Sequence, residues 1–302
     1  MPTPMQRAGF SHLLYPGLNK EYLLTYGAYP EEYTKYLNIE TSDRYKEEDL
    51  VVAGFGLVPE KAEGATPVYD VMKMSEKKAY IHKTYVLGFE VTEEANEDEL
   101  YGILKKAPRA LAIAVKQTID TLAASVLNNG FSASFPGIDG KALFATDHPQ
   151  LKAGGTVSNR AAIDVDFDIT SLSDALLTWE QWTDDNGFPL LLKPKWIFGS
   201  PLNREIMVKT LGTEKMPGTS DNDINAIREW ELQKMILHYT TDPDAWGLLS
   251  TTAEHYMKLF WRIKPSFRGF DDQATGNARY LTRFRLSTGV THWWGTYGSP
   301  GI

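Results

Sequence analysis

The sequence predicts an α+β fold, in which long strands and one long helix come from different parts of the chain. Strand patterns fill residues 50–92 and the last part of the chain, from about residue 255. A long amphipathic pattern predicts one helix over about 94–128, and residues 161–255 alternate between strands, helices and loops. Strands and helices that are largely segregated along the chain are typical of α+β folds.

The composition is that of an ordinary globular protein. The 302 residues are 42% hydrophobic and 23% charged and contain no cysteine, which excludes disordered, collagenous and disulfide-stapled classes. The formal charge of -8 argues against a protein whose main task is to grip a phosphate backbone. No apolar run approaches the roughly 20 residues that cross a bilayer, and no signal peptide pattern opens the chain. We therefore expect a cytosolic product with no membrane partner.

The first 45 residues hold seven of the fifteen tyrosines. Their spacing is helical, but Pro30 interrupts it, which predicts two short helical turns joined by an extended elbow. Two interpretations stay open. The segment packs on the chain's own core, or it is an arm that lays aromatic rings on a neighbouring subunit, because tyrosine is favoured at interfaces. The ring contacts of such an arm would come from Tyr15, Tyr22 and Tyr26.

The next region has strand patterns separated by one polar stretch. The predicted strands are residues 50–58, 67–74 and 79–92. The intervening stretch 59–66 is polar and contains glycine, which predicts an exposed loop tip. A long two-stranded hairpin without a third strand is marginally stable in water, so we expect it to lean on something else. The tip residues that would make this contact are Pro59, Glu60, Lys61 and Glu63.

The predicted long helix begins with an acidic run. Residues 93–99 contain five carboxylates, which the positive end of a helix dipole favours, and apolar residues then recur at steps of three and four up to Val126. Gly130 follows as a stop signal. Pro108 removes one backbone hydrogen bond, so we expect the helix to bend or split near Ala107.

Residues 132–159 form a long loop by composition, and a mixed region follows. A helix over 169–185 is predicted, with Thr170 or Ser171 as N-cap and a stop at Asn186 and Gly187. Further elements are a strand at 195–200, a helix at 201–212, a loop at 213–227 and strands at 230–239 and 245–250.

The last region predicts two long strands, 255–267 and 278–298, joined by a loop over 268–277. Between Lys258 and Arg285 there are seven basic residues and two acids, so the charge of the chain is polarised. Alternation places the arginines on one face of the second strand. Two interpretations stay open: the arginines lie on a solvent-exposed face of the strand, or their positive charge complements the acidic start of the helix in an adjacent copy. The second interpretation pairs Arg279, Arg283 and Arg285 with Glu93, Glu94 and Glu97.

Catalytic and metal-binding motifs are scarce. Asp147 and His148 are adjacent in a loop, and side chains of sequence neighbours seldom point at one target. The six histidines have no metal-ligand spacing, and no phosphate-binding loop is present. Trp293 and Trp294 could stack on a sugar or base, but adjacent strand residues face opposite ways, so at least one of them should be in the core. The sequence predicts no enzyme, no cofactor and no metal site.

Several stretches resemble the major capsid proteins of tailed double-stranded DNA bacteriophages. They follow one another in order along almost the whole chain. They are LYPGLN at 14–19, GFGLVPEKAEG at 54–64, TYVLGFEVTEE at 84–94, LAASVLNNGF at 122–131, LFATDHP at 143–149, GGTVSN at 154–159, NDINAI at 222–227, TDPDAW at 241–246 and GNARY at 276–280.

The resemblance implies the Hong Kong phage-type capsid fold. It maps this chain onto an N-terminal arm at 1–44, an extended β-hairpin loop at 45–86, a peripheral domain with the spine helix at 87–160, an axial domain at 161–255, and return strands of the peripheral domain with the C-terminus at 256–302.

The resemblance also implies a function. A structural, non-enzymatic major capsid protein self-assembles through pentamers and hexamers into an icosahedral shell around double-stranded DNA, with no sequence-specific DNA binding and no cofactor. It implies a precursor shell that matures, a separate scaffolding protein, a portal protein, an optional decoration protein, assembly in the bacterial host cytoplasm and a final location in the virion. Some relatives crosslink a loop lysine. Lys61, Lys73, Lys77 and Lys78 are candidates here, but the sequence gives no sign of the acid required, so we expect no crosslink.

Two alternatives remain from other functional classes. Eight tryptophans and many acids also suit a carbohydrate-active enzyme or a lectin, which would be a monomer or small oligomer that binds glycans. A phage tail or baseplate structural protein would form rings or tubes instead of a shell.

Overall fold

The computed structural model describes residues 10–92, 103–213, 224–271 and 277–302, and within them the fold is α+β, as predicted. The elements in chain order are α1 (Phe10–Ala28), η1 (Tyr33–Lys35), β1 (Asn38–Thr41), β2 (Lys46–Asp49), β3 (Val52–Ala53), β4 (Lys73–Met74), β5 (Lys78–Ile81), β6 (Lys83–Val91), α3 (Ile103–Asn128), β7 (His148–Pro149), β8 (Thr156–Val157), α4 (Ile169–Glu180), β9 (Trp196–Gly199), η2 (Pro201–Asn203), α5 (Arg204–Gly212), η3 (Ala226–Trp230), β10 (Gln233–Ile236), β11 (Trp246–Leu249), β12 (Met257–Asp271), β13 (Ala278–Val290) and β14 (Thr296–Ser299).

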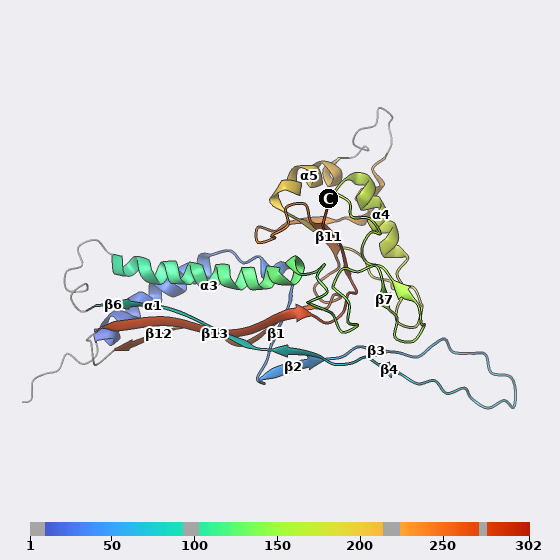
Figure 1. Cartoon of the computed structure of the whole chain (residues 1–302), viewed down its shortest axis with the longest axis horizontal. Coiled ribbons are helices and arrows are strands. Elements are labelled where there is room, and N and C mark those ends of the chain that lie inside the picture. Colours follow the sequence, from blue (N-terminus) through green and yellow to red (C-terminus); the bar gives the residue numbers. More distant parts are fainter. Residues whose placement is uncertain (1–9, 93–102, 214–223, 272–276) are drawn as a thin grey trace, which may run out of the picture.

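An elongated domain is built from α1, α3 and a four-stranded sheet with the order β1-β12-β13-β6 (Figure 1). The antiparallel pair β12 and β13 forms its backbone, and β1 joins β12 in parallel. The two helices cover one face of this sheet, because alternate residues of β13 such as Tyr280, Phe284 and Leu286 are buried beneath them. β12 continues to Asp271, so its last four residues are strand where the sequence predicted loop. Pairing of Asp271 with Ala278 on β13 extends the strand.

Helix α3 packs on the sheet through its apolar side. Leu111, Val115 and Ile119 are buried there, at the spacing that the sequence predicted. The helix runs without a break through Pro108, so it does not split near Ala107, and the predicted bend there stays a prediction. Packing of the following turns on the sheet outweighs one lost backbone hydrogen bond. By length and composition α3 could cross a membrane, but half of its apolar window is buried within the chain's own fold.

The N-terminal segment has two helical pieces separated around Pro30, as predicted, but the first piece is a helix of 19 residues instead of a short turn. α1 ends at Ala28, before Pro30, and Tyr33 belongs to the separate short helix η1. The break therefore falls at Pro30, before Tyr33, where the sequence placed it. Burial of Leu18 and Tyr22 in a cluster shared with α3 and β12 stabilises the longer helix.

The predicted hairpin of residues 50–74 is present, but hardly any of it is strand. Only Val52–Ala53 and Lys73–Met74 pair, and residues 54–72 form an extended loop that reaches far from both domains (Figure 1). The predicted strand 79–92 is divided at His82, because β5 pairs with β2 and β6 pairs with β13. Two different partners thus split one alternating pattern.

An upper domain is built from α4, α5 and a second four-stranded sheet with the order β10-β9-β11-β14. Its core is rich in tryptophan, with Trp179, Trp182, Trp246 and Trp293 all buried. Helix α4 is shorter than predicted and ends at Glu180, since the chain then turns so that Trp182 also enters the core. The N-cap of α4 is Asp168 instead of the predicted Thr170 or Ser171. Asp168 and Ser171 exchange hydrogen bonds between side chain and backbone N–H.

The two domains share one hydrophobic core. Phe198 and Leu249 of the upper sheet lie in the same buried cluster as Ile119 of α3 and Trp261 of β12. The chain passes between the domains after α3, between β11 and β12, and again between β13 and β14. Because a close-packed core resists deformation, the two domains form a stiff L-shaped body, and the loop of residues 54–72 projects from it (Figure 1).

Candidate assembly surfaces

The loop of residues 54–72, called the extended loop from here on, carries apolar side chains that its own chain does not cover. Val58 is 95% exposed, Tyr69 89% and Leu57 79%. The predicted tip residues Pro59, Glu60, Lys61 and Glu63 all lie fully on the surface. Contiguous exposed apolar side chains of this size are typical of interaction sites and not of a surface that faces water alone.

The root of the extended loop is fixed to the rest of the chain by polar contacts. Gly56 donates its N–H to Asp70 Oδ2 at 2.7 Å, and Lys152 Nζ lies 2.5 Å from the same oxygen. The bond from Lys152 and those from the backbone N–H groups of Gly56 and Val71 lower the pKa of Asp70 to about 2. Lys152 follows β7, so this ion pair ties the two chain segments of the loop to the upper part of the molecule.

The three N-terminal tyrosines contact the chain's own sheet. Tyr15 and Tyr22 stack on Phe267 of β12 with ring centroids 5.8 and 5.1 Å apart, and Tyr26 stacks on Tyr22 at 5.9 Å. Lys116 Nζ of α3 lies 3.9 Å from the centroid of the Tyr26 ring. Tyr22 is buried in its own chain, which favours the interpretation that the segment packs on its own core, while the contact of Tyr15, Tyr22 and Tyr26 with a neighbouring subunit stays a prediction.

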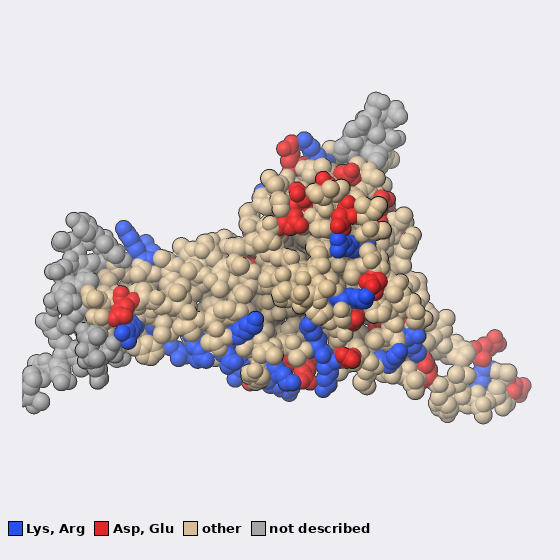
Figure 2. Space-filling model, viewed as in Figure 1, with Lys and Arg blue, Asp and Glu red and all other residues tan. Residues whose placement is uncertain are grey.

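The sheet face opposite the helices is basic. Arg279, Arg283 and Arg285 alternate with the buried residues of β13 and so lie on this face, as predicted. Figure 2 shows Lys and Arg side chains gathered along the lower margin of the elongated domain. Arg279 Nε pairs with Glu90 Oε2 of the same chain at 3.1 Å. Arg285 Nε is buried without a hydrogen-bond partner among the described residues. The proposed acidic partners Glu93, Glu94 and Glu97 lie outside the residues that the structure describes.

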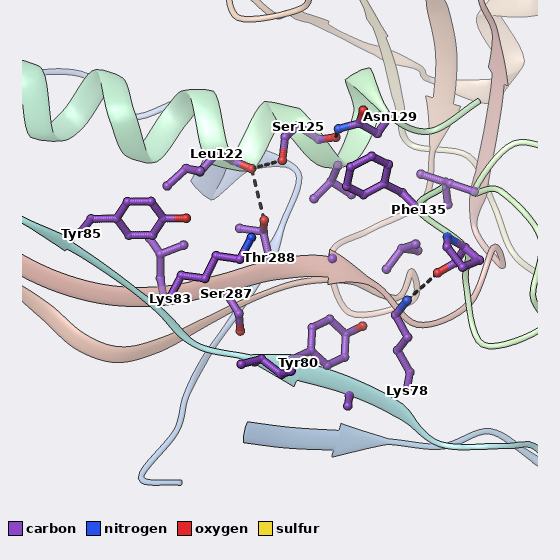
Figure 3. Close-up of a pocket in the computed structure, with 18 residues that line it drawn as sticks. Lys78, Tyr80, Lys83, Tyr85, Leu122, Ser125, Asn129, Phe135, Ser287 and Thr288 are labelled. Atoms are coloured by element: carbon purple, nitrogen blue, oxygen red, sulfur yellow. Dashed lines mark hydrogen bonds between the residues drawn. The ribbon is translucent and has the colours of Figure 1, made fainter. Parts of the chain in front are cut away.

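A cleft of about 270 Å³ opens between the start of β6, β5, the end of β13 and the last turns of α3 (Figure 3). Tyr85, Leu122 and Phe135 supply apolar walls, and Lys78 lies at one end, where its Nζ donates to the backbone carbonyl of Pro136 at 2.6 Å. Burial lowers the pKa of Lys78. Sequence reasoning missed this cleft because its walls come from separate parts of the chain with no shared motif.

Most of the chain matches the profile of one known protein family. The profile of a family described as Phage capsid protein matches residues 75–298, well over half of the chain. The chain belongs to this phage capsid protein family. As a major capsid protein it is a structural component of the virion, and its fold is the Hong Kong phage-type capsid fold. No curated protein matches it in sequence.

Solved capsid structures share the fold of this capsid protein at low sequence identity. The procapsid protein of bacteriophage JBD30 is 15% identical with a TM-score of 0.53, and the match covers 97% of this chain and 75% of that one. The protein of Microbacterium phage Oxtober96 is 12% identical with a TM-score of 0.56, covering 91% and 92%. A virus-like particle from Pyrococcus furiosus is 10% identical with a TM-score of 0.54, covering 94% and 98%.

The sequence neighbours Asp147 and His148 of the capsid protein have different partners. Asp147 pairs with Lys141, whereas His148 turns inward to Asp139, so the sequence neighbours diverge as expected. Among the described residues, no group of three His, Asp or Glu side chains could hold a metal ion. Trp293 is in the core, as predicted for at least one of the paired tryptophans.

Proposed function

We propose that this capsid protein assembles through pentamers and hexamers into an icosahedral shell that encloses double-stranded DNA. The observation that carries the proposal is the extended loop, whose apolar side chains are left exposed by a chain that otherwise has a well-packed core. A neighbouring copy in the shell would cover it. Burying one such side chain contributes about 1.5–3 kcal/mol, so the gain multiplies over all copies in a shell.

We infer the domain roles from the same mapping as the sequence suggested. Residues 1–44 act as the N-terminal arm, 45–86 as the extended hairpin region, 87–160 with 256–302 as the peripheral domain and 161–255 as the axial domain that meets its copies around the symmetry axes. The shared core of the two domains supports a rigid wedge. During maturation the wedge would rotate as one body while the extended loop re-aims against its neighbours.

Deletion of Pro59–Thr66 tests the role of the extended loop. We expect a soluble, folded chain that forms no shells in electron micrographs, because the tip that reaches the neighbour is gone while the core is untouched. A matched variant replaces the same eight residues with a glycine and serine linker of equal length. It should also fail, because the reach is kept but the side chains of Pro59, Glu60, Lys61 and Glu63 are lost. Normal shells from the deletion variant would refute the proposal.

A second contact is proposed between the basic sheet face of one copy and the acidic run of another. Arg279 already pairs with Glu90, so Arg283 and Arg285 are the bases left to meet Glu93, Glu94 and Glu97 of a neighbour. Each exposed pair is worth about 0.2–1 kcal/mol, so the effect depends on many copies. Reversing the charges of both sets together should restore assembly that either reversal alone impairs, as counted by the particle yield in sedimentation. An absence of rescue would end this proposal.

Other partners follow from the proposed shell. We propose a separate scaffolding protein, a portal protein, an optional decoration protein and packaged DNA held without sequence-specific contacts, with assembly in the bacterial host cytoplasm. The net charge of -8 supports the DNA arrangement, because a negative lining lets packed DNA slide. We expect Lys61, Lys73, Lys77 and Lys78 to remain free of crosslinks to a neighbour, which mass spectrometry of purified shells would check.

We propose that the protein has no enzymatic activity and is not a lectin. The tryptophans that motivated a carbohydrate-binding alternative are not available to stack on a sugar: five of the eight, including Trp179, Trp182 and Trp246, are buried, and none is classed as exposed. The capsid family match supports a closed shell over the rings or tubes of a tail or baseplate protein.

A further inference from the structure

His148 is buried at the junction of the two domains and makes hydrogen bonds through both ring nitrogens. Its Nδ1 lies 2.6 Å from Asp139 Oδ2, and its Nε2 lies 3.0 Å from Asn159 Oδ1. The ring also stacks on Trp293, with centroids 5.0 Å apart. Trp293 belongs to the segment that carries the chain from β13 to β14, so the histidine lies where the chain crosses from one domain to the other.

The neighbours of Asn159 fix the orientation of its amide. Its Nδ2 donates to the backbone carbonyls of Leu143 and Thr296 at 2.7 and 3.0 Å. Its Oδ1 accepts the N–H of Ala145 at 2.9 Å. Turning the amide over would place its NH₂ group against that N–H and its oxygen against two carbonyls. Oδ1 must therefore be the atom that faces His148, and Nε2 of the ring must be the donor.

The other nitrogen of His148 faces a carboxylate. If Nδ1 carried no proton and Asp139 were ionised, a lone pair and a negative oxygen would meet at 2.6 Å, which is repulsive. The pair must hold one further proton, either on Nδ1 as an imidazolium or on Asp139 Oδ2. Burial is the largest single influence on Asp139 and opposes its ionisation, but the hydrogen bond and charge of His148, with the N–H of Lys141, together outweigh burial and lower the pKa of Asp139. The charged pair, with the proton on Nδ1, is the consistent assignment.

Two other buried histidines, His255 and His292, have a different hydrogen-bond pattern. His255 Nδ1 accepts the N–H of Met257, and His292 Nδ1 accepts the N–H of Trp294. A ring nitrogen that accepts a hydrogen bond carries no proton, so both rings are neutral with the proton on Nε2. His82 contacts the hydroxyls of Ser42 and Ser287 through its two nitrogens, and a hydroxyl can donate or accept. Among the histidines that the structure describes as buried, His148 is therefore the one whose ring is hydrogen-bonded to a carboxylate.

We propose that Asp139, His148 and Asn159 form a proton-dependent clasp, which holds the segment 131–160 to the strand crossing between the two domains. The segment is attached at both sides of the clasp. Ile138 donates to the carbonyl of Thr291 at 2.8 Å, and Asn159 holds Leu143 and Thr296 together. When the ring loses one proton, the proton on Nδ1 stays with the carboxylate, and the lone pair left on Nε2 then faces Asn159 Oδ1, so that contact becomes repulsive and the segment is released. The clasp acts within one subunit and does not depend on the proposed shell.

Other charged groups lie around the clasp and would modulate it. His292 faces both Asp139 and His148, and Lys78 and Asp185 act on Asp139 at longer range. The backbone N–H of Lys141 donates to Asp139 Oδ1 at 3.1 Å. The side chain of Lys141 is engaged with Asp147 and does not neutralise Asp139.

Ring ¹⁵N spectra of the full-length chain, labelled at its six histidines, test the protonation state directly. At neutral pH we expect two protonated nitrogens for His148 and one each for His255 and His292. Asp139→Asn should leave the His148 ring with one proton, because the neutral amide can itself donate to Nδ1. The matched control Asp147→Asn, at the adjacent exposed carboxylate, should leave the ring doubly protonated.

Hydrogen exchange measured on the same variants tests the clasp itself. Asp139→Asn should speed backbone exchange within residues 137–148 by about tenfold or more, the effect expected when one charge-assisted hydrogen bond is lost. Asp147→Asn should leave exchange there unchanged. A singly protonated His148 in the unmodified protein would overturn the assignment. Loss of the ring proton without faster exchange would overturn the clasp.

Discussion

Gly247 lies in β11 at the closest approach of three strands in the upper sheet. A Cβ atom at this position would lie 2.1 Å from the carbonyl oxygen of Tyr297 and 2.6 Å from the ring of Phe198. Both neighbours are buried, so neither can move away freely. We predict that Gly247→Ala lowers the free energy of unfolding by about 1–3 kcal/mol, the usual cost of overpacking, as measured by urea denaturation of the unassembled chain.

Gly212→Ala is the matched control for this prediction. Gly212 is the last residue of α5, and a Cβ atom there meets nothing within 4 Å. The substitution should change stability by no more than about 0.5 kcal/mol. Equal losses at the two positions would show that the packing of the upper sheet is looser than described.

His255 predicts a dependence of stability on pH. Burial lowers its pKa to about 4, whereas the unfolded chain has the ordinary value near 6.5. Between these values the unfolded state binds more protons, so stability rises with pH and falls as the solution is acidified, by at most about 1.4 kcal/mol per pH unit from this one group. His255→Asn keeps an acceptor for Met257 N–H but cannot titrate. Its stability should fall less steeply from pH 6.5 towards 4, and an unchanged slope would contradict the prediction.

At the residue scale, sequence patterns indicate which residue types are available but not which of them meet. The alternation that placed Arg283 and Arg285 on one face is a local property of a strand, and it is confirmed. The contact between Asp139 and His148 joins a loop to a strand nine residues away, with no periodic signal. The burial of Tyr22 depended on a partner 245 residues later, Phe267, so the sequence left both of its interpretations open.

Helix α1 shows how one element depends on another. Tyr22 stacks on Phe267 of β12, and its hydroxyl accepts a hydrogen bond from Thr282 of β13 at 2.9 Å. Tyr22→Ala should lower the free energy of unfolding by about 3–5 kcal/mol, as for other large aromatic truncations in a core. Tyr22→Phe removes only the hydroxyl and should cost about 1 kcal/mol.

Thermal unfolding of the two Tyr22 variants at several protein concentrations checks this prediction. A loss that is independent of concentration is expected, because the contact lies within one chain. A loss that appears only at high concentration would instead indicate that α1 packs on a neighbour.

Elements with strong internal periodicity could be predicted from sequence, and elements defined by their partners could not. The apolar spacing of α3 and the alternation of β13 predicted the type of both elements and the start of β13, but β13 ends at Val290, before the predicted end at residue 298, and β14 is a separate strand. Helix α4 ends at Glu180 because the chain turns there to bury Trp182. The predicted strand is divided at His82 because its two halves pair with different strands. The extended loop carries strand-forming residues but has no strand partner beyond Val52–Ala53, so propensity alone overestimated its strand content.

At the scale of the whole molecule, the chain combines a close-packed core with apolar side chains on its surface that it does not cover itself. The two domains share a core, whereas the extended loop exposes Leu57, Val58 and Tyr69 to water. A chain with this division of surfaces gains stability when identical copies cover one another's loops, which is the physical basis of a closed symmetric assembly. Membership of the phage capsid protein family agrees with an assembly of many identical copies.

The most direct test is the size of the particle that the chain forms, measured by sedimentation and imaged by electron microscopy after expression together with the scaffolding protein proposed above. We predict closed shells in the megadalton range, which contain many copies of the chain. A homogeneous 33.9 kDa species that stays monomeric under these conditions would contradict it.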